Sequence, residues 1–557
     1  MNETDRHEHT QTLIERHFSS HFQEMMIAEA ALVGVVAGLI VTGYRVWLKF
    51  AESFLHYVSD AAATNPLVIL TWSLLLIMLM VVVGKLMLWE PYTQGSGMPQ
   101  VDAEVMGKIS APWKRIIPAK FVEGALGAIG GLSLGRTGES VQIGAMSGKA
   151  VSEHLKCDRG EQRLLITCGA AAGMAAAFRA PLTGTLFAIE EIHKKFTPAL
   201  IITTMTSAVI SAFISTQAMG VEPLVSIEFF DTIPHFDYAL LILMGVIFGM
   251  LGALHNIGMF YIQKANAQIQ KMLPYSRLIL PFALAGIATF CAPQLTGGGD
   301  KLISVLLAPG HKQIQFLIFL LIAKYIITSV CFGSSAPGGT LFPLIAMGMT
   351  AGAIYSLILI KIGIIPSEYY INFIVLGMAG LFAGAIRAPM TAIVLTFELT
   401  GSLNALISVS IVVILSYVTA NLLHIEPFFE YLLNRYLRII SRDDNMKLTH
   451  HTLSDLEFTR YIVSPGSKAD RTRVCDLKLP DKVRIVLIRR NNMDIMVNGM
   501  TILEPLDELI VIEEACAEAN VDVIMRSLVT GTSIDARMNQ NSDREGASDS
   551  KTTNNSN

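Results

Sequence analysis

The stretch AAAFRAPLTGTLFAIE, residues 175–190, recurs in altered form as AGAIRAPMTAIVLTFE at residues 383–398. The two stretches share seven of sixteen residues, including the run Arg-Ala-Pro and a glutamate nine positions after the proline. The alternative explanation is a chance similarity between two alanine-rich helices. The repeat predicts a chain built from two homologous halves, a plan typical of membrane transport proteins that hold their substrate between the halves.

Charged residues are distributed unevenly along the chain. Of the 557 residues, 52% are hydrophobic and 16% are charged, below the roughly 25% charged residues of soluble domains. Residues 25–436 carry 46 of the 88 charges, whereas the last 121 residues carry 35. We therefore predict a polytopic all-α membrane domain over residues 25–440, preceded by a cytoplasmic segment at residues 1–24.

Long apolar runs recur within the predicted membrane domain. Some could span about 30 Å of hydrocarbon, while others are too short or are interrupted by glycine and proline. Interrupted runs predict half-helices that meet inside the membrane. The runs are Met25 to Phe50, Pro66 to Leu88, Ile201 to Gly220, Tyr238 to Phe260, Leu278 to Phe290, Gln315 to Phe332, Ile371 to Glu398 and Leu403 to Leu423.

The pattern changes after the last apolar run. Arg435, Arg438 and Arg442 follow that run, and the positive-inside rule places this end in the cytoplasm. Residues 455–526 then form a predicted small α+β domain. Its expected elements are strands at Val483 to Arg490, Met493 to Val497 and Glu508 to Glu514, and a helix from about Ala515 to Leu528. Residues 527–557 lack apolar periodicity and are predicted to be disordered.

Several functional classes are disfavoured by composition. A net charge of −4 without a basic block argues against nucleic acid as a partner. The six cysteines are scattered without CxxC spacing, so neither a metal site nor a disulfide framework is expected. No constellation predicts an enzyme. The acidic, polar N-terminal segment predicts no cleavable signal peptide.

Four glycine-marked segments interrupt the membrane domain. They are GSGMP (Gly95 to Pro99), GRTGES (Gly135 to Ser140), GGG (Gly297 to Gly299) and APGGTLFP (Ala336 to Pro343). Glycine permits sharp turns before a helix, and the first turn of a helix offers N–H groups without partners. Converging helix N-termini would bind a small anion. The alternative role of these glycines is close helix packing.

These segments resemble a known family. GSGMP, GRTGESVQIG, GAAAGMAAAFRAPLTGTLFAIEE and APGGTLFP, in this order over about 400 residues, are similar to the CLC chloride channels and chloride/proton antiporters. The resemblance implies the CLC fold, with inverted repeats of tilted and partly spanning helices. It also implies a homodimer in the cell membrane (bacterial inner membrane), with one chloride pathway per subunit and both termini in the cytoplasm.

The resemblance also implies an anion site. Its residues correspond here to Ser96, Gly97, Gly339, Thr340, Leu341 and Phe429. Leu341 replaces a phenylalanine that is usual in the family. Phe429 replaces a tyrosine, so the steric plug is kept while a hydroxyl donor is lost; a register slip of two would place Tyr431 there instead.

The most informative departure from the family is Thr137. The family pattern GREGP has a gating glutamate at this position, which both competes with the anion and carries a proton. A hydroxyl near neutral pH does neither. We therefore expect a passive chloride channel.

Three other carboxylates keep an antiporter open as the alternative. Glu139 is a candidate displaced gate, or else an N-terminal helix residue favoured by the helix dipole. Glu123 is a weaker candidate, or else faces an aqueous vestibule or a partner subunit. Glu191 matches the inner proton-accepting glutamate, or else belongs to surface pairs of Glu190 with Lys194 and of Glu191 with Lys195.

Other possibilities concern the substrate and the basic residues. A fluoride exporter is disfavoured because Ser96 is retained in GSGMP. The basic residues Arg136, Lys120, Arg179 and Arg387 are candidates for attracting anions. For Arg179 and Arg387 we favour structural pairing with the glutamates of the repeat.

Residues 455–526 resemble a TrkA-C (RCK C-terminal) module. Such modules dimerise and bind small regulatory ligands, including cyclic dinucleotides, which the resemblance makes a candidate ligand here. Arg489 and Arg490 could face a phosphate, although a solvated strand end is the favoured interpretation.

Overall fold

The structure is a computed structural model that divides the chain into two units. It describes residues 22–64, 67–194, 196–220, 238–269, 274–308, 310, 312–401, 405–440, 456–464, 466–479, 483–490, 493–514, 524–525 and 527–529. Unit 1 comprises residues 1–157 and 161–448, and unit 2 comprises residues 158–160 and 449–557. Each unit is described by itself.

Unit 1 is helical and contains the repeat. Its first half consists of α2 (Phe22–Thr64), α3 (Leu67–Trp89), α4 (Met98–Val105), α5 (Trp113–Ile129), α6 (Thr137–His154), α7 (Arg159–Phe178), α8 (Pro181–Phe187) with the following π-helical turn η2 (Ala188–His193), and α9 (Pro198–Met219). The second half consists of α10 (Tyr238–Ile269), α11 (Pro274–Cys291), α12 (Asp300–Leu307), α13 (Ile314–Gly333), α14 (Leu341–Ile362), α15 (Tyr370–Ile386), α16 (Pro389–Thr400) and α17 (Leu406–Leu422). Helix α18 (Phe428–Ile440) follows both halves.

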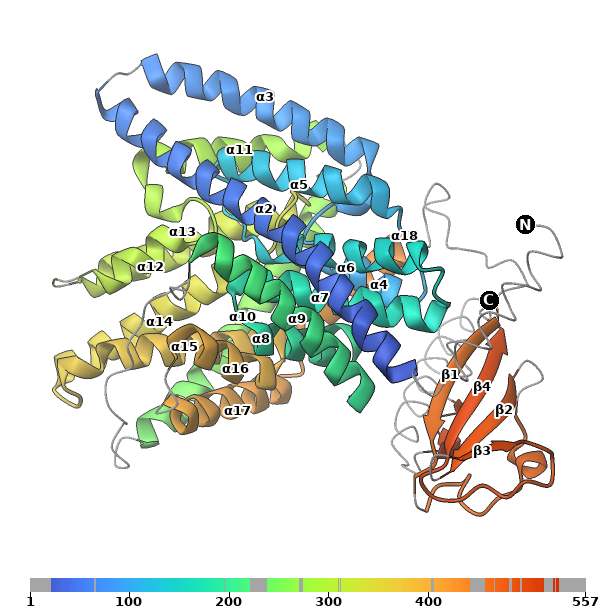
Figure 1. Cartoon of the computed structure of the whole chain (residues 1–557). Coiled ribbons are helices and arrows are strands. Elements are labelled where there is room, and N and C mark those ends of the chain that lie inside the picture. The colour runs from blue at the N-terminus through green and yellow to red at the C-terminus, as the bar shows by residue number, and fades with distance from the viewer. Residues whose placement is uncertain are drawn as a thin grey trace, which may run out of the picture. The chain divides into compact units, whose positions relative to one another are not determined.

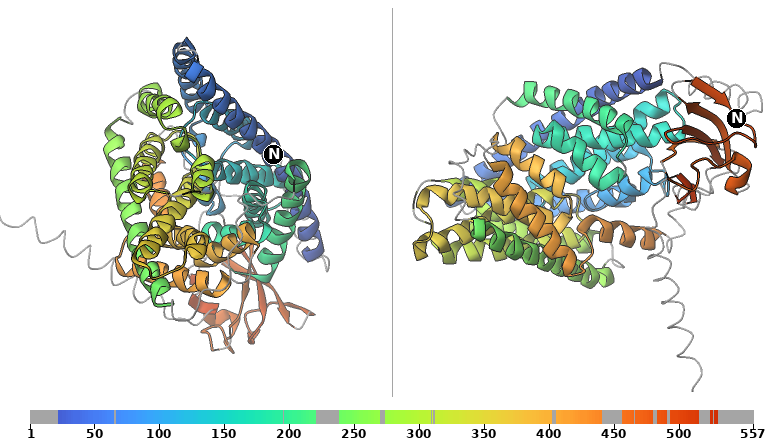
Figure 2. Two further views of the ribbon diagram at one scale, coloured as in Figure 1. Left: turned by 90° about the vertical axis from the view of Figure 1, so that its left-hand side faces the viewer. Right: turned by 90° about the horizontal axis from the view of Figure 1, so that it is seen from below.

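Unit 1 combines long and short helices that lie at different angles to one another (Figure 1). Within the described residues, seven helices are long and apolar enough to cross a membrane. The first half, blue to green, lies beside the second half, which runs from yellow-green to orange (Figure 2). The prediction of a mostly helical membrane domain is confirmed.

One predicted apolar run proves to be two helices. The run from Ile371 to Glu398, which contains proline, is divided between α15 and α16. Arg387 adopts the left-handed conformation, with φ of 72°, and Pro389 opens the next helix. Proline has no N–H group and clashes with a preceding helical turn, so the chain must break here.

The two halves meet at two glycines that hold equivalent places, each two residues before the start of a helix, α6 or α14. Gly135 and Gly339 lie 204 positions apart and pair with each other, the N–H group of each donating to the carbonyl of the other at 2.6 and 2.8 Å. Residues that are equivalent in two halves can pair in this reciprocal way when they lie near a shared two-fold axis. The pseudo-symmetry axis of unit 1 therefore passes close to these glycines.

The glutamates of the repeat exchange partners between the halves. Glu190 accepts hydrogen bonds from the backbone N–H of Thr391 at 2.8 Å and from its hydroxyl at 2.7 Å. Glu398 accepts the equivalent bonds from Thr183, at 2.7 and 2.5 Å. Each carboxylate thus satisfies the N-terminus of a helix in the opposite half, where negative charge is favoured.

This exchange corrects two interpretations made from the sequence. Glu190 bonds the start of α16 instead of forming the expected surface pair with Lys194. The arginines of the repeat do not pair with these glutamates either. Arg179 donates to the carbonyl of Gly220 at 2.7 Å, and Arg387 donates to Asn421 and to carbonyls at the end of α17. Both arginines have left-handed backbone, with φ of 58° and 72°, at the breaks before α8 and α16.

Close helix packing in the second half depends on glycine. A Cβ atom at Gly348 of α14 would lie 2.8 Å from the carbonyl oxygen of Gly377 in α15, which is closer than any side chain tolerates. The first half repeats this contact between α6 and α7 at Gly144 and Gly169. The glycines allow the helix that starts at the candidate site to lie against the next helix in both halves.

Unit 2 contains a four-stranded antiparallel sheet with strand order β1-β4-β2-β3. The strands are β1 (Leu456–Ile462), β2 (Val483–Arg490), β3 (Met493–Met496) and β4 (Glu508–Glu514). The three predicted strands are confirmed, whereas β1 was not predicted. Most of the predicted helix from Ala515 to Leu528, and the predicted tail, lie outside the described residues.

Arg490 forms ion pairs at the end of β2 in unit 2. Its guanidinium donates from Nε and Nη2 to the two carboxylate oxygens of Asp507, both at 2.8 Å, and from Nη1 to Glu504 at 2.7 Å. The hydrogen bonds that Arg490 donates to Asp507 raise the pKa of Arg490. The bidentate pair fixes the guanidinium at the end of β2, where the side chain remains 23% exposed.

Candidate functional site

A small cavity lies where the glycine-marked segments of both halves meet. Its volume of about 10 Å³ is close to the roughly 10–15 Å³ that a single water molecule requires. We call it the anion cavity, and it is lined by Ser96, Met98, Thr137, Gly138, Gly339, Thr340, Leu341 and Phe429. The cavity therefore suits one small, largely dehydrated group.

Three helices begin at the wall of this cavity. Helices α4, α6 and α14 start at Met98, Thr137 and Leu341. Their N-terminal N–H groups and helix dipoles favour negative charge. The arrangement supplies positive potential without a full cationic charge, which lets an ion bind and also leave.

Two hydroxyl groups add hydrogen-bond donors to the wall. The Thr137 hydroxyl is buried and has no hydrogen-bond partner among the described residues. The Ser96 hydroxyl accepts a bond from the N–H of Met98 at 3.3 Å, which leaves its own proton available for donation. Buried polar groups normally have partners, so the Thr137 hydroxyl suits a bound anion.

A buried lysine holds the first loop of the cavity in place. Lys120 of α5 donates to the carbonyls of Thr93 at 2.6 Å and of Gly95 at 2.7 Å. Ser96 follows directly, between Gly95 and Gly97, whose φ values are 71° and 83°. The expectation that Lys120 attracts anions from solution does not fit its full burial; its described contacts position the Ser96 loop.

Two sequence assignments to the anion site need correction. Gly97 is not part of the cavity wall. It is the left-handed cap of α4, and a Cβ there would lie 2.8 Å from the Cβ of Gln142. The segment Gly297 to Gly299 does not line the cavity either, because Gly297 and Gly298 line a second pocket.

Phe429 closes the cavity on the α18 side. Its ring packs edge-on against Phe187, with ring centroids 6.0 Å apart. Tyr431, the alternative by register slip, stacks on Phe260 at 3.7 Å and does not line the cavity. The structure therefore has a phenyl ring, without a hydroxyl donor, at the position of the expected plug.

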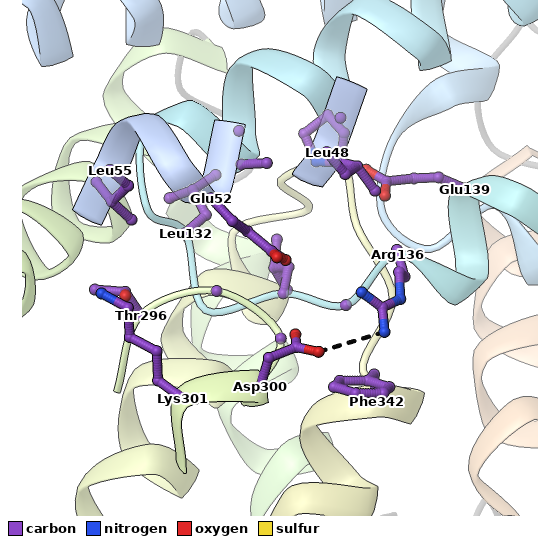
Figure 3. Close-up of a pocket in the computed structure, with 18 of the residues that line it drawn as sticks. Leu48, Glu52, Leu55, Leu132, Arg136, Glu139, Thr296, Asp300, Lys301 and Phe342 are labelled. Carbon is purple, nitrogen blue, oxygen red and sulfur yellow. Dashed lines mark hydrogen bonds and ion pairs between the residues drawn. The ribbon is translucent and has the colours of Figure 1, made fainter. Parts of the chain in front are cut away.

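A second pocket of about 80 Å³ adjoins the anion cavity (Figure 3). Gly135 and Arg136 line this pocket, and the next two residues, Thr137 and Gly138, line the cavity. We call it the Arg136 pocket; its charged or titratable lining residues are Glu52, His56, Arg136, Glu139, Asp300 and Lys301. A small ion moving between the cavity and the α2–α12 end of unit 1 would encounter this mixed charge.

Glu139 faces the Arg136 pocket instead of the anion cavity. Its side chain is buried on the first turn of α6, and one carboxylate oxygen accepts a 2.5 Å hydrogen bond from the Tyr44 hydroxyl. Gly124 makes room for both groups, since a Cβ there would meet a Glu139 oxygen at 2.5 Å. To contact an ion in the cavity, this carboxylate would have to leave Tyr44.

Glu123 is enclosed by the protein. Its Oε1 atom accepts a hydrogen bond of 2.9 Å from the Thr93 hydroxyl, and its side chain is fully buried. Because the side chain is fully buried within a single chain, Glu123 faces neither an aqueous vestibule nor a partner subunit, and these two interpretations from the sequence are wrong. Glu123 stabilises the same loop that Lys120 holds.

Glu191 is buried on η2 and lines neither the anion cavity nor the Arg136 pocket. Lys195, its proposed surface partner, lies outside the described residues. Asp102 of α4 interacts electrostatically with Glu191 and is itself buried. The Oδ1 atom of Asp102 lacks a hydrogen-bond partner among the described residues.

Sequence reasoning missed three residues around the site. Asp102 gave only a weak signal, an acidic residue four positions after Met98 in a short polar stretch. Tyr44 and Asp300 gave no comparable signal, since only the folded chain brings them to Glu139 and Arg136.

The fold and the site together define a class of protein. Two homologous halves enclose a small cavity at helix N-termini within a bundle of membrane-length helices, which is the arrangement of a membrane transport protein for a small anion.

Comparison with known proteins gives the family. Residues 75–421 match the family described as voltage gated chloride channel, and the chain belongs to this CLC family. Residues 458–515 match the TrkA-C domain. The resemblances drawn from GSGMP, GRTGES and the C-terminal strands are confirmed, and the chain is a multi-pass membrane protein.

Named relatives cover most of unit 1. The H(+)/Cl(−) exchange transporter ClcA of Vibrio parahaemolyticus is 31% identical over 426 residues, covering 73% of this chain and 89% of the relative. A slow cyanobacterial Cl−/H+ antiporter of known structure is 27% identical, with a TM-score of 0.69, covering 74% of this chain and 98% of that protein. A CLC-type fluoride/proton antiporter shares the fold, at 23% identity and a TM-score of 0.59 over 72% and 96% of the two chains.

Proposed function

We propose that this CLC-family chloride transport protein exchanges chloride for protons. The named relatives are chloride/proton exchangers, and they favour the antiporter alternative over the passive channel that Thr137 alone suggested. The proposal assigns chloride to the anion cavity, the outer proton-carrying role to Glu139 and the inner one to Glu191.

The observation that supports this proposal most directly is the position of Glu139. This buried carboxylate lies two residues after cavity-lining Thr137, faces the Arg136 pocket and has a hydroxyl partner in Tyr44. A carboxyl group in such a place can hold a proton when neutral and compete with an anion when charged. Rotation from Tyr44 toward the start of α6 would bring it to the anion path.

We propose the orientation of unit 1 in the membrane from the basic residues that follow the membrane helices. Arg435 and Arg438 of α18 support a cytoplasmic α18 end. We assign the Arg136 pocket to the external side, because α12, which contributes to its lining, lies away from α18 in unit 1 (Figure 1). In this orientation Glu139 receives protons from outside, and Glu191 with Asp102 receives them from the cytoplasm.

The test is coupled flux in liposomes of purified protein. A chloride gradient should drive protons uphill in the parent, and E139Q should keep chloride flux while losing proton movement. E153Q is a matched control on α6, because Glu153 lies at the opposite end of that helix and is bonded to the Trp113 indole. Proton pumping by E139Q equal to that of the parent would exclude Glu139 as the carrier.

A second candidate function, passive chloride conduction, is favoured by the Thr137 hydroxyl. This group lines the cavity and lacks a partner among the described residues, so it suits an anion ligand better than a gate. Chloride flux without any uphill proton movement at several pH values would support this candidate over exchange. In the same assay, fluoride outcompeting chloride would revive the fluoride exporter.

Three further predictions remain open. We propose a homodimer in the bacterial inner membrane with both termini cytoplasmic, as the family resemblance implies. We also propose that residues 455–526 bind a small regulatory ligand such as a cyclic dinucleotide. The guanidinium of Arg490 already binds Asp507, so a phosphate contact by Arg490 would require this pair to open.

A further inference from the structure

Three buried titratable groups lie together where α5 packs against α6. Lys120 and Glu123 are one turn apart on α5, and Glu139 is on the first turn of α6. Glu139 lies against α5, because a Cβ at Gly124, the residue after Glu123, would be 2.5 Å from its Oε1 atom. Lys120 interacts electrostatically with both carboxyl groups. We call these three residues the α5–α6 cluster.

The α5–α6 cluster contains one cation for two carboxyl groups. A buried charge without a compensating partner is strongly unfavourable, and neighbouring carboxyl groups at such a site retain a proton between them. The buried pair of Glu104 and Lys149 is a contrast, because there one lysine contacts one carboxylate directly. Lys120 instead donates to the carbonyls of Thr93 and Gly95. Neutrality of the cluster therefore requires one proton on one of its two glutamates.

The contacts of Glu123 are compatible with both of its protonation states. The Thr93 hydroxyl lies 2.9 Å from Oε1 of Glu123 and 2.7 Å from the carbonyl oxygen of Glu90. Because a hydroxyl has one proton, Thr93 either donates to an ionised Glu123, or donates to the Glu90 carbonyl and accepts from a neutral Glu123. The Oε2 atom of Glu123 is buried without a hydrogen-bond partner among the described residues. The Glu90 carboxyl group adds further negative charge near Glu123.

The contacts of Glu139 complete this arrangement. Tyr44 of α2 donates a hydrogen bond of 2.5 Å to its Oε2 atom, a bond that an ionised carboxylate accepts. Glu139 also lines the Arg136 pocket, whose other charged or titratable lining residues are Glu52, His56, Arg136, Asp300 and Lys301 (Figure 3). With Glu123 neutral and Glu139 ionised, each described hydrogen bond of the two carboxyl groups has a donor and an acceptor.

We propose that Glu123 is a second proton-carrying residue, and that it shares a single proton with Glu139. The inference rests on the proposed exchange, in which Glu139 exchanges protons with the external side. Transfer in either direction breaks the O–H bond of one carboxyl group and forms one on the other, so the total charge of the α5–α6 cluster is constant. Lys120 compensates whichever glutamate is ionised, and a neutral Glu139 can leave Tyr44 without removing charge from the cluster.

The test is the pH dependence of chloride-driven proton movement in liposomes of E123Q. Without the second carboxyl group, Glu139 is alone with Lys120, so it holds no proton near neutral pH. The pH of half-maximal proton movement should therefore fall by at least about one pH unit, a tenfold change in proton concentration. E123D keeps a carboxyl group and should restore the profile of the parent.

E104Q is the matched control, because Glu104 is also buried but is paired with its own lysine, Lys149. This variant should keep the half-maximal pH of the parent. An unchanged half-maximal pH in E123Q, or an equal shift in E104Q, would overturn the shared proton and leave Glu123 a structural role in its loop. E123L provides a second neutral variant if E123Q is poorly folded, because apolar residues of similar volume can replace buried charges.

Infrared difference spectra of detergent-solubilised protein provide a readout that needs no transport. A protonated carboxyl group has a carbonyl stretching band that a carboxylate lacks, and at neutral pH the parent should show this band in excess over E123Q. Equal bands in the two proteins would also overturn the shared proton. A parent that moves chloride without protons but shows the excess band would overturn exchange and leave the shared proton intact, so the two proposals fail separately.

Discussion

The loops before α4 and α12 have the same architecture but different chemistry. Each consists of a 3-10 turn, at Pro91–Thr93 or Pro293–Leu295, a glycine-rich segment and an eight-residue helix. Each is held by a buried lysine that bonds two carbonyls; Lys324 bonds those of Leu295 at 3.0 Å and Gly297 at 2.7 Å.

The difference between these loops lies in a few side chains. The first loop supplies Ser96 to the anion cavity, while the equivalent position of the second loop is Gly298 in the Arg136 pocket. Both halves therefore keep the lysine that supports the loop backbone. Only the first loop has the Ser96 hydroxyl donor, and only the helix after the second loop begins with a carboxylate, that of Asp300. The backbone that the two loops share supports the anion path, and the side chains that differ between the loops give the anion cavity and the Arg136 pocket different chemistry.

The largest expected effect comes from removing either lysine. K120M and K324M each leave two buried carbonyls without a donor, which should lower stability by on the order of 3 kcal/mol. Thermal unfolding in detergent measures this loss. Among folded protein, K120M should impair chloride binding more than K324M, since only Lys120 holds the Ser96 loop. Equal binding by both variants would show that the loops are functionally equivalent.

The glutamates exchanged between the halves should have equal effects. E190A and E398A each remove hydrogen bonds from a helix N-terminus, and each should lower stability by about 1 to 3 kcal/mol. Chemical denaturation of both variants gives the comparison. If E398A unfolds far more easily than E190A, the two ends of this exchange are not energetically equivalent.

The equivalent positions Ser96 and Gly298 should respond differently. S96A removes one hydroxyl donor from the anion cavity and should weaken chloride binding about fivefold, the factor for a hydrogen bond worth about 1 kcal/mol. G298S should not strengthen chloride binding, because a Cβ there lies 2.9 Å from the Phe342 ring. Calorimetric titration with chloride distinguishes the two, and a gain in affinity for G298S would contradict the assignment.

The smallest effect is expected at Phe429, which belongs to neither repeat. F429Y restores a hydroxyl donor next to the cavity and should tighten chloride binding by about two- to threefold, at the lower end of a single hydrogen bond. The same titration measures this change. F428Y on the same helix is the control, because Phe428 does not line the cavity; a similar gain there would contradict a direct contact.

Local sequence signals were sufficient for much of the fold and part of the site. The lengths of the apolar runs predicted most membrane helices, and the resemblance of the Gly-rich segments to the CLC family predicted the anion-site residues Ser96 and Thr340 and the gate position Thr137. Interpretation of the sequence failed where one local pattern was compatible with two different structures. Glu190 near Lys194 suggested a surface pair, although its actual partner, Thr391, lies 201 positions away.

The sequence by itself determined that this chain has two related membrane halves, a set of helix starts suited to an anion, and a separate strand-rich C-terminal module. These properties follow from the periodicity of apolar residues and from residue types that act locally. Only the tertiary structure decided that Glu139 bonds Tyr44 and that Asp300 meets Arg136. The electrostatics of a site depend on distances between segments far apart in the chain, and no local pattern encodes those distances.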